Sequence, residues 1–172
     1  MATRTSMGVF GKGRRGIGAA GWALRGAAAG AAGTTALNAV TYLDMAGRGR
    51  GTSSTPERTV EALARKAHLS IPGEGETREN RLQGLGPLTG IAAGVGVGAL
   101  AGLGRAAGFR PPVWLGGVAA GLAAMIGSNG PMTVLGITDP RTWSTTDWIS
   151  DVVPHLAYGF ATHSTLAALD RA

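Results

Sequence analysis

Cysteine is absent from this chain of 172 residues. Its absence excludes a disulfide framework and any metal site built on thiolates. Charged residues are also scarce, at 15% of the chain compared with roughly 25% in a typical soluble domain. The sequence further lacks an HExxH motif, a Gly-x-Ser-x-Gly motif, a phosphate-binding P-loop and a dinucleotide-binding fingerprint. We therefore predict that the chain is not an enzyme and binds neither a cofactor nor a metal ion.

The missing charges leave four long uncharged segments, each about as long as a membrane span of ~17–25 residues. They lie between Arg25 and Asp44, Arg81 and Arg105, Arg110 and Asp139, and Asp151 and Asp170. A soluble four-helix protein needs a charged outer face on every helix, and these segments offer none. We therefore predict an all-α fold, a four-helix transmembrane bundle with spans at about 26–46, 82–103, 113–135 and 148–169.

Glycine is abundant, with 30 residues, and in the second predicted span it recurs at every fourth position. The row comprises Gly86, Gly90, Gly94, Gly98 and Gly102. Positions i and i+4 share one helix face, so the row forms a bare strip on which a second helix can pack closely, as small residues do in membranes. The pairs Gly26/Gly30 and Gly117/Gly121 favour a glycine zipper with the second span as its hub. A flexible Gly/Ala linker is the alternative.

This packing prediction has a mutational consequence. Leucine in place of Gly94 or Gly98 would fill the strip and break assembly of the bundle.

The segments outside the predicted spans carry most of the charge. Residues 1–25 form a basic leader with Arg4, Lys12, Arg14, Arg15 and Arg25, followed by a single transmembrane domain at 26–172. We interpret the leader as a topogenic signal, or as a segment that contacts anionic headgroups of the lipid bilayer. No nucleic acid partner is expected, because a membrane surface already accounts for these charges.

The polar loop 47–81 is predicted to contain one short amphipathic helix at about Pro56–His68. A hydroxyl cap, Pro56 and Glu57 mark its start. Residues 76–83 are predicted to begin the next helix. His68 has no second potential metal ligand nearby in the sequence, so a metal role is not expected.

Polar residues within the predicted spans form a candidate intramembrane polar site, comprising Asn38, Asn129, Asp151, His155, Tyr158 and Thr162. In the last span, Asp151, His155, Tyr158 and Thr162 are spaced 4, 3 and 4 residues apart and therefore share one stripe. Ionisable residues inside membrane spans favour a functional role, and an Asp–His pair suits a response to protons. The alternatives are interhelical hydrogen bonding and an interfacial position.

Asn129 precedes Gly130-Pro131, so it lies either at a helix kink or just past a helix that ends near Gly127.

Several short motifs resemble those of small bacterial inner-membrane proteins. Gly136-Ile-Thr-Asp-Pro, Trp148, Pro154-His155-Leu-Ala-Tyr-Gly159 and the terminal Leu169-Asp-Arg are similar to the last span of the YagU-like family. Gly33-Thr-Thr-Ala-Leu-Asn38 and Ser53-Ser-Thr-Pro-Glu57 resemble small membrane proteins of high-GC Gram-positive bacteria. The resemblance implies a multi-pass protein of the bacterial cytoplasmic membrane, and it implies no reaction.

Two further predictions concern the orientation of the chain in the membrane and its activity. Eight Lys and Arg residues fall on each side of a four-span arrangement, so the positive-inside rule is tied. The purely basic leader favours an N-terminus inside the cell. The leading hypothesis is a structural, accessory or scaffold protein that forms a homo-oligomer or joins a larger membrane complex. The alternative is a small transporter or proton-coupled channel that uses the polar site.

Overall fold

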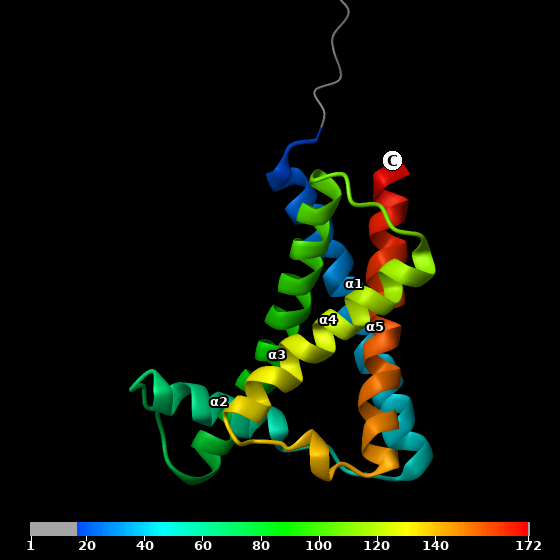
Figure 1. Cartoon of the computed structure of the whole chain (residues 1–172). Coiled ribbons are helices and arrows are strands. Elements are labelled where there is room, and N and C mark those ends of the chain that lie inside the picture. Colours follow the sequence, from blue (N-terminus) through cyan, green and yellow to red (C-terminus); the bar gives the residue numbers. More distant parts are fainter. Residues whose placement is uncertain (1–16, 172) are drawn as a thin grey trace, which may run out of the picture.

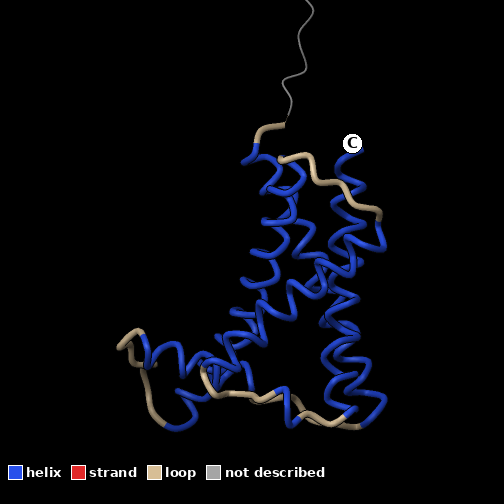
Figure 2. The backbone as a smooth tube through the Cα atoms, in the orientation of Figure 1, coloured by secondary structure: helices blue, strands red, loops and turns tan. Residues whose placement is uncertain are grey.

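The computed structural model describes residues 17–171, and the helices account for nearly all of this part (Figure 2). Five α-helices and one short 3-10 helix follow in sequence: α1 (Ala19–Arg48), α2 (Thr55–Lys66), α3 (Gly75–Ala106), α4 (Val113–Val134), η1 (Pro140–Thr142) and α5 (Thr145–Arg171). No strand occurs among the described residues. The predicted all-α class is confirmed. The basic residues Arg4, Lys12, Arg14 and Arg15 of the predicted leader lie outside the described part.

The four long helices are arranged in the order α3, α1, α5, α4. Helix α1 packs against both α3 and α5, and α4 packs against α5. Figure 1 shows α4 running obliquely from the C-terminal part of α5 toward α2, whereas α3 is upright. The start of α1 and the ends of α3 and α5 lie at the same end of the molecule (Figure 1). The opposite end carries α2 and the α4–α5 connection.

The helix boundaries differ from the sequence prediction mainly at the ends. Helix α1 begins at Ala19, so most of the segment 17–24 lengthens the first helix. Residues 76–83 belong to α3, as predicted. Helix α4 continues through Gly130 and Pro131 to Val134, so the alternative of a helix that ends near Gly127 is wrong.

The closest helix contact joins the backbones of α1 and α3. A Cβ atom added to Gly26 or Gly98 would overlap the carbonyl oxygen of the other residue. One added to Gly30 would lie 2.5 Å from the carbonyl oxygen of Gly94, and one added to Gly102 would overlap the carbonyl oxygen of Trp22. These four positions have no room for a side chain, because the two main chains are themselves in contact.

The remaining glycines of the predicted row have different neighbours. Gly94 faces Thr34 of α1 and Tyr158 of α5, and Gly86 faces Pro56 of α2. Gly90 is exposed and has nothing within 4 Å of an added Cβ, so its predicted role in packing is wrong.

The predicted hub is also wrong for the third span. Gly117 packs against the Phe160 ring, and Gly121 lies close to Gly159 and the His155 carbonyl group. The glycine pair of α4 therefore meets α5 and not α3. The sequence showed the bare strips, but it did not show which of them face each other.

By length and composition, two of the described helices, α3 and α4, are suited to cross a membrane. Helices α1 and α5 are long enough, at 30 and 27 residues, but neither contains a continuous stretch as apolar as those of α3 and α4. Polar side chains lower their hydropathy, including Thr34, Thr35, Asn38 and Thr41 in α1 and His155, Thr162 and His163 in α5. The structure thus supports a helical protein with two candidate membrane spans.

Substituting alanine at Gly98 tests the α1–α3 contact. The added Cβ would force two backbones apart, and we expect a loss of about 1–3 kcal/mol in the free energy of unfolding. The matched control is Gly96→Ala in the same helix, where nothing lies within 4 Å. That change should be neutral or stabilising by up to about 1 kcal/mol, since alanine favours helix. The stabilities of the two variants are compared by denaturation in detergent micelles, followed by circular dichroism. Equal stabilities would contradict the close contact between α1 and α3.

Candidate functional site

A polar cluster lies between α4 and α5, at the end of the bundle that carries the α4–α5 connection. The Asn129 side-chain amide donates a hydrogen bond of 2.7 Å to an Asp151 carboxylate oxygen. His155 Nδ1 lies 2.7 Å from the Asp151 carbonyl oxygen and 3.5 Å from its carboxylate. His155 Nε2 lies 3.2 Å from the Ser128 hydroxyl. Both ionisable side chains are largely buried, at 20% and 13% exposed for Asp151 and His155.

The geometry of this cluster accommodates His155 with or without a positive charge. In the neutral ring, Nδ1 donates to the Asp151 carbonyl group and Nε2 accepts from the Ser128 hydroxyl. In the charged ring both nitrogens donate. The Ser128 hydroxyl then accepts from Nε2 and turns its proton to the Ala124 carbonyl oxygen, 3.0 Å away. The charged ring would lie beside the Asp151 carboxylate, so both forms of the ring find hydrogen-bond partners here.

The rest of the predicted polar stripe on α5 faces a different neighbour. Tyr158 is 1% exposed and donates a 2.6 Å hydrogen bond to the Gly94 carbonyl oxygen of α3. Thr162 is fully buried against Gly33 of α1. Its hydroxyl oxygen has no hydrogen-bond partner among the described residues. Tyr158 and Thr162 therefore belong to the helix-packing core. The polar stripe of α5 thus contacts α4 through Asp151 and His155, and contacts α3 and α1 through Tyr158 and Thr162.

Asn38, on α1, is not part of the polar cluster. Its side chain is half-buried and makes no hydrogen bond within residues 17–171. An open, apolar hollow of about 380 Å³ adjoins the cluster and is lined by α4, Pro140 and Trp148, with Asn129 at its wall. Within the described residues, no group of three or more acidic or histidine side chains is placed to hold a metal ion.

A second cluster, which we did not predict from the sequence, joins α1, α3, α5 and the α3–α4 connection at the other end. We call it the arginine cluster; it comprises Trp22, Arg25, Arg105, Arg110, His163 and Asp170. Arg105 is 5% exposed and donates to Asp170 at 3.0 Å and to His163 Nε2 at 3.2 Å. Arg110 donates to the same carboxylate at 2.9 Å. Arg25 donates to the Leu169 carbonyl oxygen at 2.6 Å.

Aromatic rings organise this cluster. The guanidinium carbons of Arg25 and Arg110 lie 5.4 and 5.7 Å from the centroid of the buried Trp22 ring, within cation–π range. The His163 ring lies directly against Gly116, where a Cβ atom would overlap it. His163 Nε2 lies 3.2 Å from the Arg105 guanidinium group, which only donates, and 3.3 Å from the Pro111 carbonyl oxygen, which only accepts. The positive charge of Arg105 beside the ring disfavours a charged imidazole. His163 therefore fits here as a neutral ring.

One sequence signal for the arginine cluster was available. Arg25, Arg105 and Asp170 each bound an uncharged segment, so helices of similar length side by side would place these charges at one level. The partnership of His163 with Arg105 had no signal, because His163 lies off the polar stripe of α5. Its contact depends on how α5 is rotated against α3 and α4.

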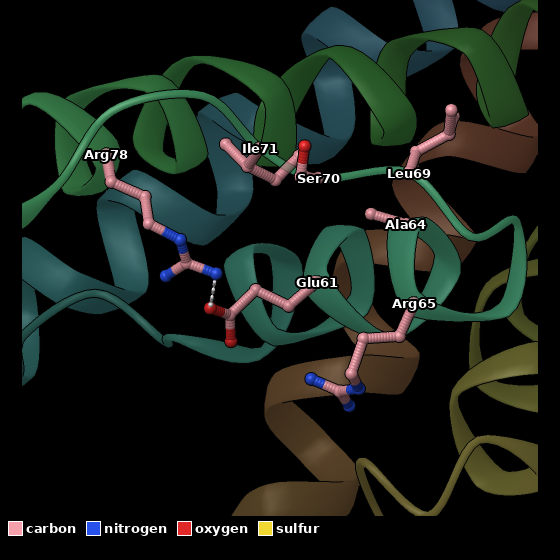
Figure 3. Close-up of a pocket in the computed structure, with 7 residues that line it drawn as sticks. All are labelled: Glu61, Ala64, Arg65, Leu69, Ser70, Ile71 and Arg78. Atoms are coloured by element: carbon pink, nitrogen blue, oxygen red, sulfur yellow. Dashed lines mark ion pairs between the residues drawn. The ribbon is translucent and has the colours of Figure 1, made fainter.

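A third polar feature joins α2 to the start of α3. Figure 3 shows Arg78 reaching toward Glu61 at an open hollow of about 230 Å³, and the two side chains form an ion pair of 2.7 Å. Arg65, one turn further along α2, is not joined to this pair (Figure 3). Because both side chains of the pair are partly exposed, the contribution to stability is modest. The ion pair tethers α2 and shows no arrangement for chemistry.

No protein-family model, curated protein or solved structure matches this chain. The resemblance to YagU-like membrane proteins therefore stays a prediction from short motifs.

The Asp170 ion pairs predict an acid-sensitive stability. The hydrogen bond from Arg110, with the charges of Arg110 and Arg105, keeps the pKa of Asp170 below its ordinary value of 3.8 against the opposing effect of burial. A lowered pKa stabilises the fold above pH 3.8, and the stabilisation disappears as pH falls through the lowered value. Asp170→Asn should therefore be less stable than wild type at pH 7, and the difference should shrink below pH 4 in detergent unfolding measurements. A difference that is constant from pH 7 to pH 3 would contradict this.

Proposed function

We propose that this chain is an integral membrane protein that crosses the bilayer four times and has a structural or accessory role. The observation that carries the proposal is the alignment of the uncharged parts of α1, α3 and α5. Polar contacts join α1 and α3 to α5 at one end of the uncharged parts, and α1 to α5 at the other end.

The first end is the arginine cluster, where Arg25 of α1 donates to the Leu169 carbonyl oxygen of α5 and Arg105 of α3 donates to the Asp170 carboxylate of α5. At the other end, Arg48 of α1 binds Asp44 and donates a 2.7 Å hydrogen bond to Ser150 of α5. Between these levels α1 and α5 have about 18 residues without a formal charge, or roughly 27 Å of helix at 1.5 Å per residue. That length is close to the ~30 Å of a bilayer core.

The outward faces of the bundle also fit lipid. Large apolar side chains are exposed on α3 and α4, including Leu88, Ile91, Leu100, Leu103, Leu115, Leu122 and Ile126. Soluble monomers rarely expose so much contiguous apolar surface. Trp143 and Trp148 pack edge to face, with centroids 5.0 Å apart, beside the α4–α5 connection, and tryptophans favour the headgroup level. Lipid contact on these faces accounts for both features.

A structural or accessory role fits how the glycines and pockets are arranged. The glycine contacts between α1 and α3 resemble a glycine zipper, and here they hold the bundle itself together. The two hollows described above lie at the surface, one beside α2 and the other between α4 and the α4–α5 connection. The apolar faces of α3 and α4 then remain available for lipid, a second copy or a larger membrane complex.

Cysteine labelling tests the four-span arrangement, because the natural chain has no cysteine to remove. Single cysteines at Gly18, Gly51 and Ala107 lie before α1, after α1 and after α3. Four spans place Gly18 and Ala107 on one side and Gly51 on the other. Labelling with a membrane-impermeant maleimide, compared between intact and lysed cells, shows on which side of the membrane each cysteine lies. If Gly18 and Gly51 label alike, while Ala107 differs, only α3 and α4 cross the membrane and the four-span proposal fails.

A second candidate function is proton-coupled movement of a solute, and the polar cluster favours it. His155 can be charged or neutral within the same set of partners, and the Asp151 carboxylate beside it has no arginine or lysine partner within the described residues. The adjoining apolar hollow would give a small solute access to Asn129. Asn38 does not reach this cluster, so the site consists of Ser128, Asn129, Asp151 and His155.

Proteoliposome measurements separate the two functions. If the polar cluster carries protons, an imposed pH gradient should acidify vesicles that contain wild-type protein. His155→Ala should lower that flux at least tenfold, because it removes the group that accepts the proton. His68→Ala, at an exposed position after α2, is the control and should leave the flux unchanged. Absent flux in wild type, or equal flux in His155→Ala, would exclude the transport function.

A further inference from the structure

The arginine cluster contains more positive than negative charge. Arg25, Arg105 and Arg110 all donate to the end of α5, where Asp170 is the acidic residue of the cluster, and Arg25 and Arg110 also lie beside the Trp22 ring. The next residue, Arg171, adds another positive charge. We propose that this cluster binds the phosphate of an anionic phospholipid headgroup. The inference rests on the proposed membrane location and names a partner for it.

The existing contacts leave hydrogen-bond donors free. Arg105 is occupied by Asp170 and His163, whereas Arg25 makes a single side-chain hydrogen bond among the described residues, to the Leu169 carbonyl group. Arg110 has 46% of its side chain exposed and lies beside the same indole ring as Arg25. Both guanidinium groups are positively charged, so both attract an anion that binds beside them. A phosphate group accepts several such charge-assisted hydrogen bonds.

The surroundings favour a lipid over a soluble anion. Leu24 and Phe109 directly precede Arg25 and Arg110 in the sequence and are 72% and 65% exposed. The basic side chains therefore stand next to exposed apolar ones, at the end of the uncharged part of the bundle. A phospholipid matches this pair of features, because its phosphate lies at the headgroup level and its acyl chains extend along the apolar helix faces. Inorganic phosphate would use only the charges.

Lipid binding by the full chain tests this proposal. The purified protein in a neutral detergent is titrated with phosphatidylglycerol or phosphatidylcholine, and bound lipid is counted by native mass spectrometry. We expect retention of phosphatidylglycerol and weaker retention of phosphatidylcholine. Arg110→Gln should weaken phosphatidylglycerol binding about fivefold, which is the equivalent of about 1 kcal/mol per basic residue near a membrane. Arg25→Gln provides a second variant with the same expected direction.

Two controls distinguish binding from structural support. Asp170→Asn breaks the same ion pair as Arg110→Gln but removes a negative charge, so binding should be equal or tighter. Arg141→Gln breaks an exposed pair with Asp139 in the α4–α5 connection and should have no effect.

Three results would overturn the proposal: equal weakening by Arg110→Gln and Asp170→Asn, equal retention of both lipids, or displacement of the lipid by millimolar inorganic phosphate. A chain that alkaline carbonate extracts from membranes would instead refute the membrane location. An integrated chain without lipid preference would refute the headgroup site alone.

Discussion

The contact between the backbones of α1 and α3 is the constraint on which the rest of the bundle depends. Gly26 and Gly30 face Gly98 and Gly102 with no side chain between the helices. This closeness brings Gly94 and Thr34 near the centre of the bundle, where Tyr158 of α5 donates its hydroxyl proton to the Gly94 carbonyl oxygen. The position of α5 thus follows from a surface that α1 and α3 form together.

A second close contact between helix backbones joins α4 and α5. Gly159 of α5 lies against Gly117 and Gly121 of α4, so these two backbones are also in contact. Close approach between helices is favourable in lipid because van der Waals packing, and not the hydrophobic effect, drives association there. The two glycine contacts pair α3 with α1 and α5 with α4, and Gly33 of α1, which lies against Tyr158 and Thr162 of α5, joins the two pairs. They also determine which polar side chains meet: Asn129 and Ser128 reach α5 because α4 lies so close to it.

Polar groups concentrate at the two ends of the bundle and have opposite character. The arginine cluster has an excess of positive charge around one carboxylate, which suits contact with anionic headgroups. The polar cluster at the other end contains a carboxylate, an amide, a hydroxyl and an imidazole, with no arginine or lysine partner among the described residues. For a structural protein the arginine cluster alone would suffice, because it would anchor the bundle at the headgroup level. The second arrangement is what supports transport as an alternative to a purely structural role.

The sequence by itself determined the helical class and the approximate helix positions, because charge-free segments and capping residues depend on local composition alone. It also determined that Asn129, Asp151 and His155 were worth considering together, since the last two lie one turn apart on a helix. Only the tertiary structure decided the partners. Asn38 and Gly90 were expected to take part and do not, whereas Arg105, His163 and Ser128 do. The physical reason is that helical periodicity defines faces, but the rotation of each helix against its neighbours depends on packing between all of them.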